Sequence, residues 1–161
     1  MKLPSSFQPL RHRNFALVWG AGMVSNAGSW MQTVAVGAFV TAKTGRAGWA
    51  GLIAAAAFLP IGLLAPIGGA LADRLNRRFF VLCTNLGEAV MASLLAWLAL
   101  TGQATPVRVA LVVFVAGCLT AIALPFRQAM TLDLVPRGDL LAAASLGSAQ
   151  YNMGRVLGPS L

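Results

Sequence analysis

The densest group of reactive side chains lies in a ten-residue stretch between two long apolar runs, Gly69-Ala-Leu-Ala-Asp-Arg-Leu-Asn-Arg-Arg78. Its charged members are one acid and three bases: Asp73, Arg74, Arg77 and Arg78. A carboxylate in such a loop can bind a guanidinium of another helix or a helix N-terminus. Asn76 tolerates the left-handed backbone that turns a chain between two helices. These residue types favour a loop that forms ion pairs with another helix, with a plain basic hairpin as the alternative.

A second motif with a physical role is Gly154-Arg-Val-Leu-Gly-Pro159, near the end of the sequence. Gly154 and Gly158 are four residues apart, so another helix can approach their backbone closely. Pro159 removes a helix hydrogen bond and bends or softens the helix. We expect a helix here whose packing and bend are set by these three residues.

Four charged residues lie in or at the ends of apolar runs: Glu88, Arg127, Asp133 and Arg155. In a membrane, Glu88, Arg127 and Arg155 each cost about 2.5–3.5 kcal/mol or more at the bilayer centre unless they are paired or hydrated. We expect Arg127 and Asp133 to join the charge cluster of Asp73. Arg155 then faces a cavity and contacts an anionic substrate or Glu88. The alternative, that Glu88, Arg127 and Arg155 all form structural ion pairs, stands on equal terms.

Polar and small residues recur at spacings of three and four in the first apolar run: Gly22, Ser25, Asn26, Ser29, Gln32 and Thr33. Such spacings put them on one face of a helix. An unmet polar group costs several kcal/mol in hydrocarbon, so this face must be turned towards protein or water. Six such residues favour the wall of a polar cavity over simple helix–helix contact.

The composition indicates that these residues lie in a membrane and not in a water-soluble domain. Of the 161 residues, 58% are hydrophobic and 10% are charged, against about 25% charged in a soluble domain. The formal net charge of +8 does not indicate nucleic-acid binding, because the basic residues punctuate apolar runs and form no basic face. Cys83 and Cys118 lie in apolar runs without a CxxC spacing, which predicts packed thiols, and neither a disulfide framework nor a metal site.

The apolar runs are long enough to cross a membrane, which takes roughly 20 residues. After a basic tail over residues 1–14, a partial N-terminal transmembrane domain over residues 15–161 divides into spans at about 15–40, 49–72, 79–101, 106–134 and an incomplete 140–161. The sequence thus predicts an all-α membrane protein with four transmembrane helices and the start of a fifth. Seven basic residues fall on one side of the spans and three on the other, which predicts an N-terminus in the cytoplasm.

No set of residues suited to catalysis is found in the sequence. The one histidine, His12, stands between Arg11 and Arg13 in the tail, where a basic cluster ordinarily contacts lipid headgroups. A Gly-rich phosphate loop, an HExxH motif and carboxylates paired at catalytic spacing are all absent. We therefore expect no enzyme activity, no cofactor and no bound metal.

The loop of residues 69–78 resembles the signature G-x-x-x-D-R-x-G-R-R/K of the major facilitator superfamily, found between its second and third helices. The one departure is Asn76 in the place of a glycine. Gly154-x-x-x-Gly158-Pro159 is similar to the start of the fifth-helix signature of the antiporter branch, G-x-x-x-G-P-x-x-G-G. Two further segments look like the branch of enterobactin exporters and related bacterial efflux proteins: Pro125-Phe-Arg-Gln-Ala129 and Leu134-Val-Pro-Arg137.

This resemblance implies a bundle of twelve helices in two six-helix halves that works by alternating access, each half containing two inverted three-helix repeats. The chain would supply the N-terminal part of that bundle. Asp73 would latch the outward-facing state, and the loop arginines would hold partner carboxylates. Gly154, Gly158 and Pro159 would set the bend of the fifth helix.

The implied function is secondary active transport, with proton-coupled export of small molecules of the drug or siderophore type. The expected partners are membrane lipid, the small-molecule substrate, protons as coupling ion and the missing C-terminal half of the transporter, and not nucleic acid. The expected location is the bacterial plasma (inner) membrane. The alternative is a small non-transporting polytopic membrane protein that acts as a partner subunit, or a non-functional fragment. A reading frame that continues past Leu161 would favour the transporter.

Overall fold

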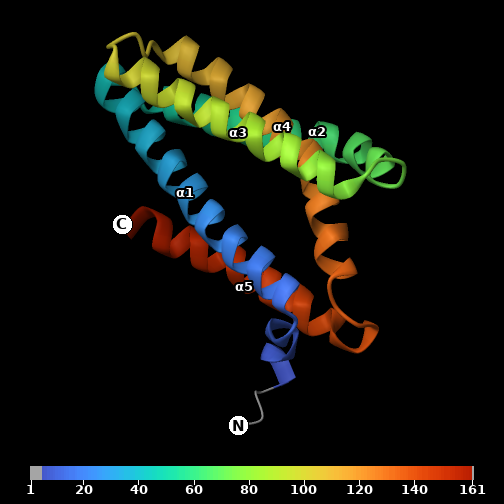
Figure 1. Cartoon of the computed structure of the whole chain (residues 1–161). Helices are drawn as coiled ribbons and strands as arrows, with labels where there is room; N and C mark the ends of the chain where they lie inside the picture. Colours follow the sequence, from blue (N-terminus) through green and yellow to red (C-terminus); the bar gives the residue numbers. More distant parts are fainter. Residues whose placement is uncertain (1–4, 161) are drawn as a thin grey trace. The chain divides into compact units, whose positions relative to one another are not determined.

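The computed structural model describes residues 5–160 and consists of five α-helices and two short 3₁₀ segments (Figure 1). In chain order the elements are η1 (Ser5–Arg11), α1 (Arg13–Thr44), α2 (Ala47–Ala72), α3 (Arg77–Leu100), α4 (Pro106–Asp133), η2 (Arg137–Asp139) and α5 (Leu140–Ser160). This described range contains no strand. Residues 1–4 of the predicted tail and Leu161 of the predicted last span lie outside it.

The α-helices begin and end within four residues of the predicted spans, at places that the local backbone dictates. α1 ends before Gly45, whose φ of 65° is left-handed and whose N–H bonds to the carbonyl of Thr41 at 2.8 Å. α3 is followed by Gly102, which has a φ of 69°. A side chain would be strained at such φ values, so glycine is favoured there. Pro106 begins α4. The N–H groups of the first helical turn have no partner within the helix, so the N–H that proline lacks costs no hydrogen bond there.

In the described part of the chain, three helices are long and apolar enough to cross a membrane by length and composition: α2, α3 and α4 up to Thr131. The sequence predicts four complete spans, so this number is smaller. α1 is the longest helix, but polar residues interrupt its apolar run, and α5 is interrupted by Gln150, Asn152 and Arg155. A helical chain with three such helices is an all-α membrane protein, which confirms the predicted fold class.

The helices divide between two compact units, each with its own packing. The first unit holds η1, the start of α1, η2 and α5, and Phe15, Ala143 and Leu146 are buried together there. The second unit holds the end of α1, α2, α3 and most of α4. Its core draws on all four of these helices and includes Val40, Ile53, Leu95, Leu98, Val109, Val112 and Val113.

Glycines set the closest helix approaches in the second unit. A Cβ at Gly68 of α2 would lie 2.7 Å from the carbonyl oxygen of Ile122 on α4. A Cβ at Gly117 of α4 would lie 2.7 Å from the carbonyl oxygen of Ala57 on α2. Both contacts are with backbone atoms, which cannot rotate away. A side chain at either glycine would therefore push α2 and α4 apart.

The same contact covers a break in α2. Pro60 has no N–H, so the carbonyl of Ala56 cannot make its usual helix bond. A Cβ at Gly117 would lie 3.1 Å from this carbonyl oxygen, so α4 passes directly over the break. Helix interruptions are tolerated in membrane proteins where a neighbouring helix covers them.

Candidate functional site

The loop between α2 and α3 carries the predicted gate residues. α2 ends at Ala72, and the N–H of Arg74 bonds to the carbonyl of Leu71 at 3.0 Å. Asp73 occupies the C-cap position, and its side chain is exposed, as is that of Arg78. A latch would need a partner for Asp73 on another helix, so its role as a latch stays a prediction.

Asn76 does not have the left-handed backbone predicted for it. Its φ is −67° and its ψ is 107°, and within the described range only glycines have positive φ. Asn76 is instead the N-cap of α3, because its side-chain oxygen accepts the N–H groups of Arg78 and Phe79 at 3.1 and 3.3 Å. Asn is among the best N-cap residues, and Gly is also accepted there. Asn in place of the signature glycine thus preserves the start of α3 by capping.

Arg77 and Gly69 complete the loop. Nε of Arg77 donates to the carbonyl of Ala72 at 3.4 Å and ties the start of α3 to the end of α2. A Cβ at Gly69 would meet no atom within 4 Å, in contrast to one at Gly68. Within the second unit, close packing therefore depends on Gly68 and not on the signature glycine beside it.

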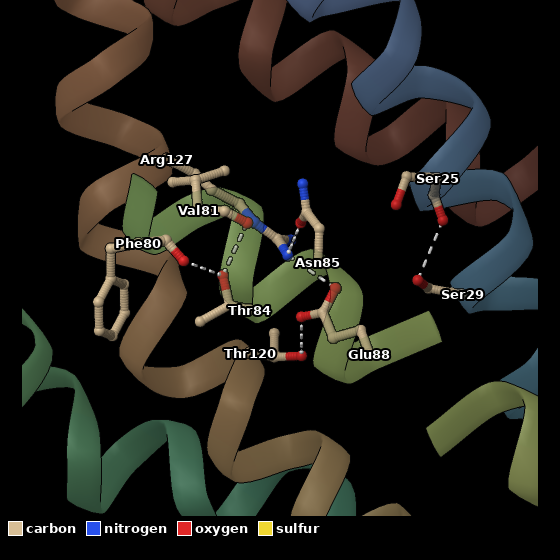
Figure 2. Close-up of polar contacts among 9 residues, drawn as sticks. All are labelled: Ser25, Ser29, Phe80, Val81, Thr84, Asn85, Glu88, Thr120 and Arg127. Atoms are coloured by element: carbon tan, nitrogen blue, oxygen red, sulfur yellow. Dashed lines mark hydrogen bonds and ion pairs between the residues drawn. The ribbon is translucent and has the colours of Figure 1, made fainter. Parts of the chain in front are cut away.

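The polar residues of α3 and α4 form a hydrogen-bonded cluster in the second unit (Figure 2). Glu88, halfway along α3, accepts from Nη2 of Arg127 at 2.7 Å and from the Thr120 hydroxyl at 2.9 Å. The same Nη2 donates to Oδ1 of Asn85 at 2.8 Å. Thr120 and Arg127 are two turns apart on α4, and Asn85 and Glu88 are one turn apart on α3. Each helix thus presents two polar groups on one face.

This cluster, defined by Asn85, Glu88, Thr120 and Arg127, satisfies both oxygens of a carboxylate in the middle of an apolar helix. Without such partners the charge would be costly in hydrocarbon. The side chains of Glu88 and Arg127 are 23% and 33% exposed, so the pair is not sealed in the interior of the unit. Protonation of the carboxylate would remove its attraction for the guanidinium. The arrangement gives the carboxylate one charged and one neutral hydrogen-bond donor.

The structure pairs Glu88 with Arg127 within the second unit, and a contact of Arg155 with an anionic substrate or with Glu88 stays a prediction. The reason for the pairing is the close packing of α3 on α4, where a Cβ at Gly87 would lie 2.9 Å from the side chain of Leu119. The two helices are near enough for the opposite charges to meet. The grouping of Arg127 and Asp133 with Asp73 also stays a prediction.

Side-chain amides and an indole join α1 to α5 in the first unit. Nδ2 of Asn26 donates to the carbonyls of Gln150 and Tyr151 at 3.1 and 3.3 Å. Nε2 of Gln150 donates to the carbonyl of Trp19 at 2.7 Å, and Nε1 of Trp19 donates to that of Leu146 at 3.0 Å. Asn26 therefore serves helix–helix contact, which was the disfavoured interpretation of this residue.

The remaining polar residues of the α1 face behave differently. The Ser29 hydroxyl donates to the carbonyl of Ser25 at 3.0 Å (Figure 2), and the Thr33 hydroxyl donates to that of Ser29 at 2.8 Å. All three side chains are exposed in the first unit, and Gln32 is half-buried. The hydroxyls of Ser29 and Thr33 are satisfied within α1 itself, as is usual for Ser and Thr in membrane helices. The role of this α1 face in a cavity wall stays a prediction.

The two signature glycines of α5 lie against α1. A Cβ at Gly154 would lie 2.8 Å from Cγ of Asn26, and a Cβ at Gly158 would lie 2.7 Å from the carbonyl oxygen of Ala27. This is the close helix approach that a four-residue glycine spacing allows. Pro159 follows within α5, but its side chain lies outside the described residues, and its effect on the helix stays a prediction.

Arg155, beside the first of these glycines, lies over an aromatic ring of α1. Its Cζ is 5.6 Å from the centroid of the Trp30 ring, a distance typical of a cation–π contact. Tyr151, one turn earlier on α5, meets the same indole edge-on, with centroids 5.7 Å apart and planes at 70°. The three side chains form a second polar and aromatic group, in the first unit.

Residues 4–161 match a family model of the major facilitator superfamily described as "Transmembrane secretion effector". The chain belongs to this family. The match covers nearly the whole chain and confirms the resemblance inferred from the loop and fifth-helix signatures. The family and the relatives below are transporters, in agreement with the expectation that the chain is not an enzyme. The chain is accordingly a membrane-embedded, multi-pass member of the superfamily.

Curated bacterial transporters are among its relatives. The chain is 27% identical to the staphyloferrin A transporter of Staphylococcus aureus, over 83% of this chain and 34% of that protein. It is 26% identical to macrolide efflux protein A of Streptococcus pyogenes, over 91% of this chain and 36% of that protein. The chain therefore spans about a third of the length of the curated relatives it matches. No solved structure matches the chain significantly.

The structure of this family member also contains partners that had no role in the sequence-based hypotheses. Thr120 completes the cluster around Glu88, and its spacing of two turns from Arg127 is a signal that could have found it. Nε2 of His12 lies 3.2 Å from Oδ2 of Asp139 and ties the start of α1 to η2. No sequence pattern indicates this second pair, because its members are 127 residues apart.

Proposed function

We propose that the protein containing this chain is a secondary active transporter that exports small molecules of the drug or siderophore type by alternating access, driven by a proton gradient. The observation that carries the proposal is the family match over residues 4–161. Two relatives support the substrate range, since one is a staphyloferrin A transporter and the other a macrolide efflux protein. The second half of the bundle is the partner with which this chain alternates between the two states.

Glu88 is the residue of this chain that carries the coupling proton. When its carboxylate binds a proton it loses its charge, and the bond from Arg127 weakens. The bond of 2.8 Å to Asn85 then still holds the guanidinium. The Thr120 hydroxyl can turn from donating to accepting, because a hydroxyl does both. Glu88 thus keeps the Thr120 hydroxyl as a hydrogen-bond partner in either protonation state.

The loop between α2 and α3 acts as the gate. Asp73 stands exposed at the end of α2 and binds a guanidinium or a helix N-terminus of the other half in the outward-facing state. The cap by Asn76 and the bond from Arg77 to Ala72 hold the loop backbone on either side. The carboxylate is therefore presented in a defined position, which a latch needs.

The protein lies in the bacterial plasma (inner) membrane with its N-terminus in the cytoplasm. The distribution of basic residues between the two sets of loops supports this orientation. A cysteine in place of Gly138 should react with a membrane-impermeant thiol reagent only from the cytoplasmic side. One in place of Gln103 should react only from the outside. The reverse labelling pattern would contradict the orientation.

The transport proposal is tested by expressing the intact gene product in a strain that lacks its own efflux pumps. Accumulation of radiolabelled erythromycin, a macrolide, and of radiolabelled staphyloferrin A is then measured. Expression should lower accumulation of at least one, and a protonophore should abolish the effect. The Glu88→Gln variant should be present in the membrane but lose proton-driven export. Unchanged accumulation of both compounds with a correctly inserted protein would contradict the proposal. Export that persists in Glu88→Gln would remove Glu88 as the proton carrier.

A further inference from the structure

Trp30, Tyr151 and Arg155 form an aromatic group in the first unit, in which a guanidinium and a phenol ring both contact one indole. The Arg155 guanidinium lies over the indole of Trp30 at 5.6 Å, and the Tyr151 ring stands at 70° to that indole. Arg155 is exposed, and Tyr151 is 50% exposed. The flat guanidinium of α5 and the Tyr151 ring of α5 thus lie next to the Trp30 ring of α1.

The backbone beneath this group is held tightly. A Cβ at Gly158 would lie 2.7 Å from Cβ of Trp30, so α5 packs directly on the base of the indole side chain. Asn26, one turn before Trp30, donates to the carbonyl of Tyr151 at 3.3 Å. Both rings are therefore anchored at their bases, and only their outer parts and the guanidinium are exposed. A preorganised site of this kind loses little conformational freedom when a ligand binds.

Within the first unit, the charge of Arg155 has no anionic counterpart among the described residues. No carboxylate of that unit lies within ion-pair distance of it there, and its contact is the Trp30 ring. Charged residues in membrane helices ordinarily pair or mark the path of a substrate or ion. The ring occupies one face of the guanidinium, whereas its N–H edge remains available for two parallel bonds to a carboxylate. The charge therefore complements an anion.

We propose that Trp30, Tyr151 and Arg155 form a substrate subsite for an aromatic carboxylate. The carboxylate would bind the N–H edge of Arg155, and the ligand ring would pack against the exposed parts of the two aromatic side chains. This inference rests on the proposed transport function and narrows its substrate class to organic anions with a flat apolar body. Trp30 and Tyr151 determine the shape of the accepted ligand, and Arg155 determines its charge.

The test measures equilibrium binding of radiolabelled salicylate to the purified intact gene product in nanodiscs of phosphatidylcholine, with neutral salicylamide as the matched competitor. Arg155→Ala should weaken salicylate binding by about tenfold or more, because a bond to a charged group is lost. The salicylate affinity of Arg155→Lys should lie between those of the unmodified protein and Arg155→Ala, since lysine keeps the charge but lacks the planar guanidinium. Trp30→Ala should weaken binding by a factor of about 2–5. Arg108→Ala, which alters an exposed arginine bonded to Gln103, should change nothing.

Three results would overturn the subsite. The first is no saturable salicylate binding in the millimolar range, or equal competition by salicylamide. The second is an Arg155→Ala variant with a lower melting temperature and unchanged salicylate affinity, which would make Arg155 part of a structural ion pair elsewhere in the transporter. The third is displacement of salicylate by phosphatidylglycerol added to the nanodiscs, which would assign Arg155 to a lipid headgroup. Because binding is measured without transport, macrolide export with normal salicylate affinity in Arg155→Ala would end this inference and leave the transport proposal standing.

Discussion

The contact between α2 and α4 at Gly68 gives the most direct test of the packing, through the substitution Gly68→Ala. The added Cβ would lie 2.7 Å from the carbonyl oxygen of Ile122 and 3.0 Å from its Cα. Both are backbone atoms, so no rotamer change relieves the overlap, and α2 and α4 must separate. Overpacking of this kind typically costs about 1–3 kcal/mol. Separation also weakens the dispersion contacts along the rest of the interface.

Two opposite effects act in this variant, and a control separates them. Replacing Gly by Ala in a helix interior by itself stabilises by about 0.5–1 kcal/mol. Gly62 lies in the same helix, and a Cβ there would meet no atom within 4 Å. Gly62→Ala should therefore show the propensity gain alone. Subtracting it leaves the overpacking term, so Gly68→Ala should be less stable than Gly62→Ala by about 1–3 kcal/mol.

The measurement is the free energy of unfolding of each purified variant in the same detergent, from titration with a denaturing detergent. Each kcal/mol should also lower the melting temperature by roughly 2–4 °C relative to the control. The packing account would be refuted if Gly68→Ala proved as stable as Gly62→Ala. Gly69→Ala, where the added Cβ has open space, should have the same free energy of unfolding as Gly62→Ala, and a higher one than Gly68→Ala.

Other variants test the loop, the ion pair and the tie between α1 and η2. Asn76→Ala should destabilise the start of α3 by about 1 kcal/mol and Asn76→Gly by only a few tenths, read from hydrogen exchange in its first turn; equal losses would argue against the cap. Arg127→Ala should cost between about 1 kcal/mol, as for an exposed pair, and the roughly 3–5 kcal/mol of a fully buried one, because Glu88 is left without its counter-charge. Adding Glu88→Gln to Arg127→Ala should restore part of that stability, and no restoration would contradict the pairing. A double-mutant cycle of His12→Ala and Asp139→Asn should give a coupling of about 0.2–1 kcal/mol, and a coupling of zero would mean that the contact contributes nothing.

The positions of the helices follow from the sequence because the length of an apolar run is a local property. Gly45 and Gly102 close α1 and α3, and Pro106 opens α4, all of which can be read from residue type. The number of helices apolar enough to span a membrane is less predictable. α1 has the length, but residues such as Asn26 and Gln32 lower its hydropathy, and only packing decides where such a helix lies.

The partners of the candidate site residues could be predicted only in part. The period of a helix shows which residues share a face, but it leaves open how one helix is rotated against the next. The pairing of Glu88 with Arg127 within the second unit depends on that rotation and could not be read from the sequence. Asn76 shows a different limit, since Asn suits both a left-handed turn and an N-cap, and only the backbone angles distinguish the two.

The two embedded charges with the strongest case for function occupy equivalent places beside packing glycines. Gly87 precedes Glu88, and Gly154 precedes Arg155; each glycine lies against a neighbouring helix of its own unit. The next residue along a helix is rotated by about 100°, so each charge emerges at the flank of a close helix contact. From there it reaches across to the neighbouring helix, as Glu88 does to α4 and Arg155 does to Trp30. A larger residue at Gly154 would press on Asn26 and on the backbone of Ala27, whereas one at Gly87 would meet the end of the Leu119 side chain, which can rotate. Substitution of Gly154 should therefore disturb the neighbouring charge more than substitution of Gly87.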